Sequence, residues 1–345
     1  MKRFLVLIMV VMMIFTGCSK KADSAVVPEV KPEDKIKVAL LCDKAGTQVF
    51  VLNMIEALQD SAVKYNFEAI IAESADSAAY EDNARALIEE GVDFIIGGGW
   101  QSGEAINKVA TEFPDAAKYA LIDSEVEATN VKCISYREQE SAYLVGIIAA
   151  MITEKDEMKF GAVHVNQGAG SWKWRYGYME GVKTIKPDAE FVFNYVGSYN
   201  DPAKAKEFSI QQYEQGARFI NAACAGGDRG VFEAALEKGF YTSGQDVDLT
   251  TPDNSYVVSS QIKDTYATME YLLGIYFSGK EWTSDNETWG VKEGTIGAVH
   301  VTHVSKNPVP EKLTAENIAA LKQAAEDIKT GKIDLTNVPA EENYK

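Results

Sequence analysis

The chain has 345 residues, and its 51 acidic against 34 basic side chains give a formal net charge of −17. Nucleic acid is therefore not an expected partner, because phosphate backbones are bound by basic surfaces and the chain has no block of basic residues. The length is sufficient for two domains of ordinary size.

The N-terminal segment has the pattern of an export signal. It starts with Met, Lys and Arg, continues as an apolar run over residues 4–15, and ends in small residues before Cys18. The run is shorter than the about 20 residues of a transmembrane helix, so residues 1–17 are predicted to be a signal peptide. We expect a lipidated Cys18 to anchor the exported chain to the cell membrane, on its periplasmic side or at the cell surface. Phe15 departs from the aliphatic residue usual at that position, and a plain secretory signal is the alternative.

Residues 18–34 follow no helical or strand period and are interpreted as a lipidated tether. Beyond them, apolar runs typical of buried strands alternate with stretches of helical period. The first set has expected strands at 36–42, 67–72, 93–96, 119–122 and 131–135 and helices at 50–64, 78–90, 103–113 and 138–152. The second set has expected strands at 159–164, 191–196, 219–223, 247–250 and 256–261, helices at 172–185, 202–215, 231–238 and 264–278, a strand pair at 295–304 and a last helix at 314–330. This alternation predicts an α/β protein with two doubly wound, parallel-sheet lobes.

Carboxylates, glycines and aromatic residues gather where the expected strands end. In sheets of this kind ligands bind beyond the carboxyl ends of the strands. Five aromatic residues fall at strand-to-helix junctions, namely Phe50, Trp100, Trp172, Trp174 and Tyr199. Their faces suit a flat heterocycle, since stacking adds about 0.5–1.5 kcal/mol beyond area burial, although core packing is an alternative for any one of them. Of the aromatic run that starts at Trp172, we expect Trp174 to face a cleft, with Trp172 as a second candidate.

The usual signatures of an enzyme are missing from the sequence. His164, His300 and His303 do not form a helix-borne metal pair, and the glycine-rich segments complete neither a Walker loop nor a dinucleotide-binding loop. No metal and no cofactor are expected, and catalysis is a minor alternative. Three cysteines, Cys42, Cys133 and Cys224, lie in or beside expected strands, with a spacing that fits no metal motif, and are predicted to be buried and free.

Six segments, taken in order, resemble one protein family. They are the Tyr-Leu-Val-Gly-Ile-Ile-Ala-Ala run at 143–150, the Trp-Arg-Tyr-Gly-Tyr-Met-Glu-Gly run at 174–181, the Tyr-Asn-Asp-Pro turn at 199–202, the glycine-rich loop at 225–231, and segments 244–248 and 260–263. The chain resembles the basic membrane protein family of substrate-binding lipoproteins, whose best-known members are purine-nucleoside receptors of ABC importers. The resemblance implies a type I periplasmic-binding-protein fold, and an ABC permease and ATPase as partners.

In that fold, two lobes are joined by three hinge crossings. The resemblance implies an N-terminal lobe from 35–136 plus about 263–285 and a C-terminal lobe from 137–262 plus about 286–310, with a helix and tail at 311–345. We expect the hinges near 135–138, 261–263 and 280–287, and closure of the lobes over a small-molecule ligand.

The resemblance also implies individual ligand contacts. Phe50 and Trp174 would stack on the base, and Lys263 would reach its edge. Asp43 and Asp123 match aspartates that follow strands, Gly227 would line the loop under the sugar, and Asp246 would hold ribose hydroxyls.

The first loop departs from the family pattern. It is shorter, and Val51 stands where a polar side chain would read the base. Loss of such a group relaxes discrimination between ligands, while Trp100 and Trp172 add aromatic area. A purine nucleoside is therefore the expected ligand, and riboflavin, with fused rings and a polyol chain, is the alternative. A sugar receptor of the same fold is a lesser one.

Overall fold

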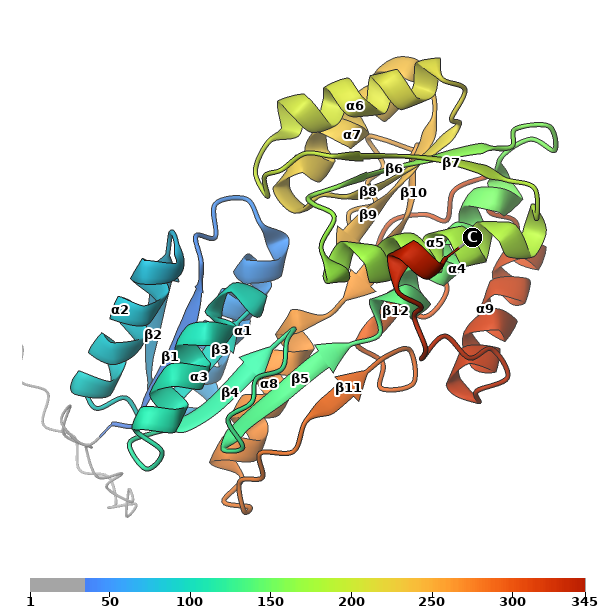
Figure 1. Cartoon of the computed structure of the whole chain (residues 1–345). Coiled ribbons are helices and arrows are strands. Elements are labelled where there is room, and N and C mark those ends of the chain that lie inside the picture. The colour runs from blue at the N-terminus through green and yellow to red at the C-terminus, as the bar shows by residue number, and fades with distance from the viewer. Residues whose placement is uncertain (1–34, 345) are drawn as a thin grey trace, which may run out of the picture. The chain divides into compact units, whose positions relative to one another are not determined.

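The computed structural model describes residues 35–344, and its strands form two six-stranded sheets, one in each lobe. The strand orders are β11-β5-β4-β3-β1-β2 and β12-β10-β9-β8-β6-β7, and Figure 1 shows the two sheets side by side with helices on both faces. Two doubly wound α/β lobes are therefore confirmed.

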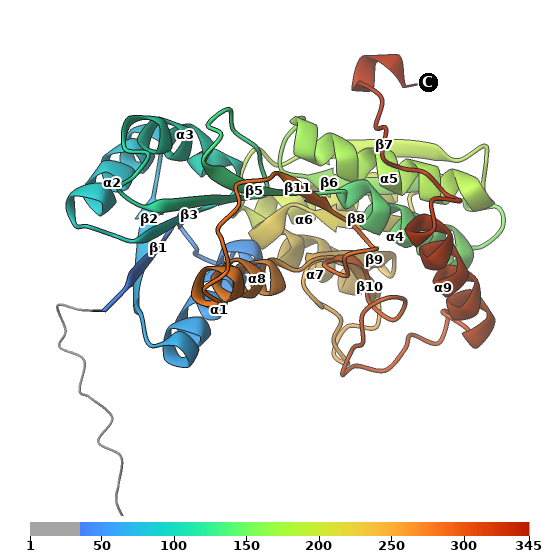
Figure 2. The same cartoon turned by 90° about the horizontal axis from the view of Figure 1, so that it is seen from below.

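The first sheet consists of β1 (Lys37–Asp43), β2 (Glu68–Ser74), β3 (Phe94–Gly98), β4 (Lys118–Ile122), β5 (Val131–Tyr136) and β11 (Glu287–Trp289), all paired in parallel. Helices α1 (Val49–Tyr65) and α8 (Thr265–Phe277) cover one face, and α2 (Ser77–Glu89) and α3 (Gly103–Glu112) cover the other (Figure 2). Alternate residues of β1 serve the two layers, because successive side chains of a strand point to opposite faces. Val38 and Leu40 pack with the α1 side, and Ala39 and Leu41 with the α2 side.

The second sheet consists of β6 (Lys159–His164), β7 (Glu190–Tyr195), β8 (Phe219–Ala223), β9 (Tyr241–Asp246), β10 (Val257–Lys263) and the antiparallel β12 (Ile296–Ala298). Its helices are α4 (Glu138–Ile152), α5 (Ala169–Ile185), α6 (Pro202–Glu214), α7 (Asp228–Lys238) and α9 (Ala315–Lys329). Helix α4 is buried almost along its whole length. It packs closely on α5, because a Cβ at Gly146, Gly177 or Gly181 would overlap the backbone of the facing helix. This contact fixes α5, whose first turns reach the cleft.

The structure differs from the expected strands in three places. A strand was expected at 247–250, but the strand in this region is β9, which lies earlier and ends at Asp246. Its Thr242, Ser243 and Gly244 are small or polar yet buried, so hydropathy did not reveal them. Strand β11 was not expected, and it pairs with β5 in the first sheet although residues from about 286 were assigned to the second lobe. The strand pair expected at 295–304 reduces to β12 followed by turns.

The chain passes between the sheets three times. It does so between β5 and α4 at 136–138, between β10 and α8 at 263–265, and between β11 and β12 at 290–295. The third crossing comes later than the expected 280–287, because β11 remains hydrogen-bonded to β5 up to Trp289.

The C-terminal tail lies on α5 rather than apart from the lobes (Figure 1). Trp172 Nε1 donates to the Pro339 carbonyl at 2.6 Å, and the Trp172 ring meets the Tyr344 ring edge-on. Arg175, which is 2 % exposed, forms a two-pronged ion pair with Glu341. The tail therefore fastens the helix that carries Trp174.

We expect Glu341→Ala to lower the free energy of unfolding by about 1–3 kcal/mol, since it leaves a buried guanidinium without its carboxylate. The measurement is urea unfolding followed by tryptophan fluorescence, which also reports on Trp172. The matched control is Glu342→Ala, because Glu342 is an exposed neighbour. Equal stability of the two variants would contradict a structural role for the tail.

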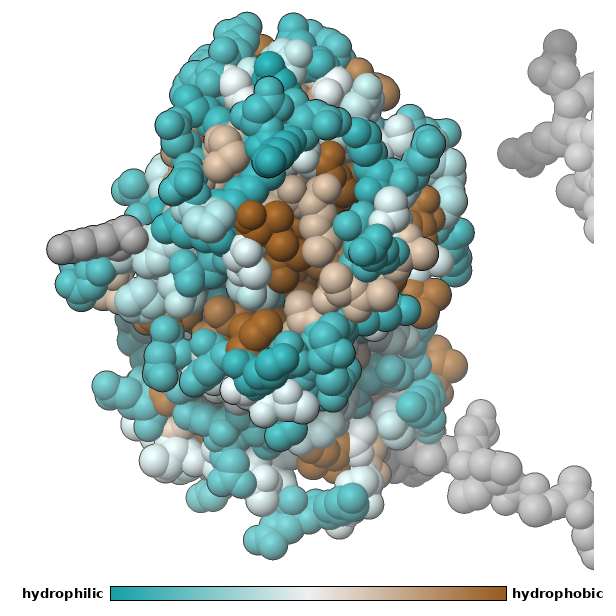
Figure 3. All heavy atoms as spheres, turned by 90° about the vertical axis from the view of Figure 1, so that its right-hand side faces the viewer, coloured by the Kyte–Doolittle hydropathy of each residue, from teal (hydrophilic) through white to brown (hydrophobic). Residues whose placement is uncertain are grey.

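Cys42, Cys133 and Cys224 are buried and free, as predicted. Within residues 35–344, no helix is both long and apolar enough to cross a bilayer. Figure 3 shows the end of the second lobe as mostly hydrophilic around a central apolar area. The predicted signal peptide, Cys18 and the tether lie outside the described residues.

Candidate ligand-binding site

A cavity of about 660 Å³ lies at the carboxyl ends of the strands and is lined by both lobes. This is the place where doubly wound sheets bind ligands. Eight of the ten predicted contact residues line it: Asp43, Phe50, Trp100, Asp123, Trp174, Tyr199, Asp246 and Lys263. Their contact with a ligand remains a prediction.

Lys263 is the centre of charge in the cavity. Its Nζ lies 2.9 Å from both carboxylate oxygens of Asp123 and 3.7 Å from Glu138 Oε1. The same ammonium lies over the rings of Phe50, Tyr136 and Trp174, at 4.9, 5.6 and 5.8 Å from their centroids. Burial opposes the charge of this side chain, but the surrounding carboxylates hold the pKa of Lys263 above its ordinary value.

Asp123 and Asp246 share an unusual backbone conformation. Asp123 directly follows β4 and Asp246 is the last residue of β9, and their φ angles are +70° and +69°. A non-glycine residue in the left-handed region is uncommon, and such strain concentrates at functional sites. Both residues line the cavity.

Burial also changes the acidity of these two carboxyls. It raises the pKa of Asp246 to about 7 and that of Asp123 to about 6, while the Lys263 ammonium pulls both pKa values back. Asp246 Oδ1 is buried and accepts no hydrogen bond from any described residue. A buried carboxylate oxygen without a partner costs free energy, so this atom is suited to accept a hydrogen bond from a bound molecule.

The mouth of the cavity is bridged by contacts between the lobes. Trp100 Nε1 donates to the Tyr199 hydroxyl at 3.3 Å, and Thr47 Oγ1 to Asn200 Oδ1 at 2.9 Å. Trp100 is 58 % exposed. The indole of Trp100 therefore offers an exposed aromatic face at the cavity.

Trp172 and Gly227 were predicted at the site, and the structure places both elsewhere. Trp172 and Trp174 are two residues apart on α5, which turns about 100° per residue, so they point to nearly opposite sides. Trp174 lines the cavity, whereas Trp172 packs under the tail. Gly227 closes the short helix η3 (Ala225–Gly227) and is buried beside Cys224. Ala225 of the same turn reaches the cavity in its place.

Several polar lining residues were missed, notably Gln48, Glu138, Asn166, Lys173 and Gln245. Gln48 fills the shortened first loop, because its Nε2 bonds to Asp43 Oδ2 and to the Lys44 carbonyl. Lys173 Nζ lies 3.1 Å from Glu138 Oε2. Glu138 begins α4 two residues after the end of β5, and this position was a usable signal, since strand ends face the site. Gln245 lies one residue before the end of β9, a strand that the hydropathy of the sequence did not indicate.

The fold and the cavity define a two-lobed receptor that encloses a small molecule between α/β lobes. Residues 36–332 match the family model Bmp, described as ABC transporter substrate-binding protein PnrA-like. The chain belongs to this family and is an ABC transporter substrate-binding protein.

Relatives and solved structures agree with this assignment. The chain is 27 % identical over 327 residues to basic membrane protein A2 of Borrelia garinii, covering 92 % of each chain. It is 26 % identical over 229 residues to the ABC transporter nucleoside-binding protein BmpA of Lactococcus lactis, covering 64 % of each. An ABC transporter solute-binding protein from Aeropyrum pernix superimposes with a TM-score of 0.77 at 24 % identity, over 89 % of this chain and 94 % of the other. The predicted type I periplasmic-binding-protein fold is thereby confirmed.

The same fold also serves another role. A transcriptional activator of the comK gene from Bacillus halodurans superimposes with a TM-score of 0.70 at 17 % identity, over 88 % of this chain and 100 % of the other. Fold similarity therefore does not choose the ligand, and the lining residues must do so. No group of three or more His, Cys, Asp or Glu side chains suited to hold a metal occurs within residues 35–344.

Proposed function

We propose that this protein captures a purine nucleoside, or a similar flat heterocycle with a hydroxylated chain, and delivers it to an ABC permease and ATPase. The observation that carries the proposal is the pairing of aromatic faces with an unpartnered carboxylate oxygen in one cavity. Phe50 and Trp174 offer the faces, and Asp246 Oδ1 offers the acceptor. A ligand hydroxyl that donates to Asp246 satisfies this oxygen. Binding closes the lobes over the ligand.

Thermal shift and titration calorimetry against purine and pyrimidine nucleosides, riboflavin and simple sugars test this proposal. We expect an aromatic compound with a hydroxylated chain to raise the melting temperature. At a ligand concentration of 100 times Kd, binding should add about 2.7 kcal/mol to the free energy of unfolding. A response to sugars alone would favour the sugar receptor. Turnover of a compound during the titration would reverse our view that the protein is not an enzyme.

Riboflavin is the second candidate ligand, and the lining of the first loop favours it. Val51 lines the cavity where a polar side chain would read a purine edge, and Trp100 adds a large aromatic face at the mouth. Co-purified flavin would give the purified protein a yellow colour. Competition between riboflavin and adenosine in calorimetry separates the two ligands.

The charge of the cavity should exclude phosphorylated ligands. Five carboxylates line it, from Asp43, Asp123, Glu125, Glu138 and Asp246, against the ammonium groups of Lys173 and Lys263. Juxtaposed like charges cost several kcal/mol, so we expect a nucleoside 5′-monophosphate to bind at least about 100-fold more weakly than its nucleoside. Calorimetry at low and high salt measures this ratio, which should shrink as salt screens the charges. Equal affinity would show that the phosphate finds a basic subsite.

We also propose that the protein is exported and held at the membrane by a lipid on Cys18. The support is the sequence of residues 1–18 together with membership of a family of ABC transporter substrate-binding proteins. Metabolic labelling with a fatty acid should mark the wild-type chain and not the Cys18→Ala variant. Equal labelling would place the anchor elsewhere.

A further inference from the structure

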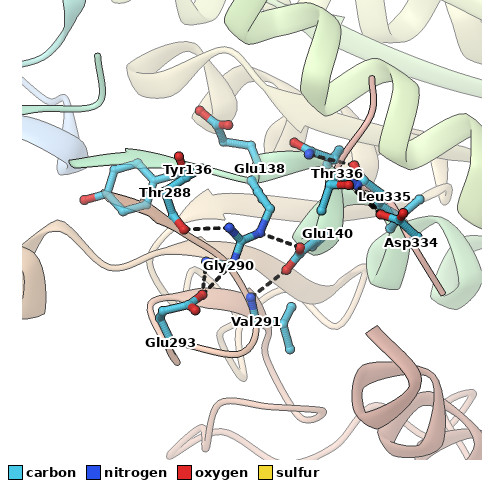
Figure 4. Close-up of polar contacts among 12 residues, drawn as sticks. Tyr136, Glu138, Glu140, Thr288, Gly290, Val291, Glu293, Asp334, Leu335 and Thr336 are labelled. Atoms are coloured by element: carbon cyan, nitrogen blue, oxygen red, sulfur yellow. Dashed lines mark hydrogen bonds and ion pairs between the residues drawn. The ribbon is translucent and has the colours of Figure 1, made fainter. Parts of the chain in front are cut away.

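Two neighbouring residues of the first crossing contact different parts of the molecule, the cavity and the third crossing. Glu138 lines the cavity, and Figure 4 shows its carboxylate pointing away from the group formed by Glu140, Gly290 and Glu293. Arg137, one residue earlier, bonds to that group. In the first crossing, Arg137 therefore contacts the third crossing, and the next residue, Glu138, faces the cavity.

Arg137 ties the first crossing to the third. Its backbone N–H donates to the Trp289 carbonyl at 2.8 Å, and its Nη1 to the Thr288 carbonyl at 2.5 Å. Its Nη2 and Nε donate to Glu293 Oε2 and Glu140 Oε1, both at 2.7 Å. A planar guanidinium can make these bonds at once, which a lysine ammonium on a flexible stem cannot reproduce.

The two glutamates close the same network on the third crossing. Gly290 N–H donates to Glu293 Oε2 and Val291 N–H to Glu140 Oε2, both at 2.7 Å. There is no room for a larger residue at Gly290, because a Cβ there would overlap the Glu140 carboxylate and approach Arg137 Nε within 2.7 Å. The chain is therefore built tightly around this ion-pair network.

Glu138 makes the corresponding contacts on the cavity side. Its carboxylate oxygens lie 3.1 Å from Lys173 Nζ and 3.7 Å from Lys263 Nζ. Lys173 comes from α5 of the second lobe, and Lys263 ends β10 at the second crossing. The second crossing is in turn bonded to the third, since Asp264 N–H donates to the Thr295 carbonyl at 2.8 Å. Each pair of crossings is thus joined: Arg137 joins the first to the third, Glu138 joins the first to the second, and Asp264 joins the second to the third.

We propose that Arg137 is a positioning residue for ligand binding: by fixing the first crossing to the third, it holds the Glu138 carboxylate against Lys173 and Lys263 in the cavity. The inference rests on the proposed function in so far as binding is its readout. Arg137 itself does not line the cavity, so its effect on affinity passes through Glu138.

The variants Arg137→Ala, Glu138→Gln and their combination, tested with adenosine and riboflavin as probes, measure this coupling. We expect each single variant to weaken binding of the probe that the wild type binds by about tenfold or more, because charge-assisted bonds are lost. The double variant should be no more than about twofold weaker than the worse single one, since residues that act together are not additive. Multiplying losses, or an Arg137→Ala variant within twofold of wild type, would overturn the proposal. The control is Arg85→Ala, which removes an arginine from an exposed ion-pair network of the first lobe.

A second readout needs no ligand. Hydrogen exchange at residues 290–294 should accelerate about tenfold or more in Arg137→Ala relative to Arg85→Ala, since the Gly290 and Val291 amides lose their ordered acceptors. If neither probe binds the wild type, the proposed function is wrong. Unchanged hydrogen exchange at residues 290–294 in Arg137→Ala would separately show that Arg137 does not order the third crossing. Should Arg137→Ala not fold, Glu293→Gln removes the negative charge that Arg137 Nη2 faces, at nearly constant shape. We expect it to accelerate the same exchange and weaken binding at least about threefold, and wild-type values for both would overturn the inference.

Discussion

Replacing Asp246 by Asn should make the ligand-free protein more stable above pH 7 and at the same time strongly weaken ligand binding. The carboxyl is 4 % exposed, and burial raises its pKa from 3.8 to about 7. The folded protein therefore holds a proton on Asp246 that the unfolded chain has lost between those pH values, and stability falls as pH rises through this window. An amide has no charge to bury, so the variant should gain about 2–4 kcal/mol above pH 7.

The gain should appear as a pH-dependent difference in melting temperature between Asp246→Asn and wild type. It should be near zero at pH 4, grow through the interval up to pH 7, and stay constant above it. Affinity should move the other way, because the ionised Asp246 accepts the ligand hydroxyl. We expect the variant to bind at least about 100-fold more weakly at pH 8, through loss of a charged hydrogen bond in a buried site.

Asp228→Asn is the matched control for this experiment. Burial likewise raises the pKa of Asp228 to about 7, but Asp228 does not line the cavity. Its Oδ1 accepts from the Cys224 N–H, a bond that an asparagine oxygen can keep. This control should gain stability above pH 7 and bind the ligand within about threefold of wild type. If both variants bind normally, Asp246 does not contact the ligand.

Lys263→Met should be among the most destabilising single changes in the cavity. Its ammonium is the shared partner of Asp123 and Glu138, and removing one member of a buried ionic cluster leaves uncompensated charge that costs about 3–5 kcal/mol. Urea unfolding at pH 8 measures this loss. The loss should shrink towards pH 5, because Asp123 and Asp246 take up protons there in the folded protein.

Two further variants separate charge from packing at Lys263. The double variant Lys263→Met with Asp123→Asn removes both members of the closest pair and should recover much of the stability, since buried pairs replaced together are often neutral. Lys312→Met, which removes the lysine of an exposed pair with Glu154, should leave the unfolding midpoint unchanged. A double variant as unstable as the single one would mean that the lysine stem, not its charge, supports the cavity.

Much of the architecture could be predicted because hydrophobic period is a local property. The run at β1 and the helical period of α4 each lie within one segment, and both elements appear where expected. Strands β9 and β11 were not predicted, because their formation depends on segments that are distant in the sequence. Thr242 and Ser243 are buried by the surrounding sheet, and β11 is a three-residue strand that pairs with β5, which lies about 150 residues earlier in the chain.

The site divides in the same way. Asp43, Asp123 and Lys263 could be proposed because they end strands or match the motifs of a family, and all three line the cavity. Trp172 could not be excluded, because its acceptor at Pro339 is 167 residues away along the chain. Glu138 and Lys173 come from different helices and meet only after α4 packs on α5.

By itself, then, the sequence of this protein determined two α/β lobes, their helices and most strand ends, because burial period and turn residues act over short distances. Tertiary packing brings the strand-end side chains into one cavity with Lys263 and places Trp172 against the tail. It also brings Arg137 against Glu293 and places Glu138 at the cavity. The physical reason is that ion pairs, carboxyl pKa values and aromatic contacts depend on distances in space between segments that sequence order leaves apart.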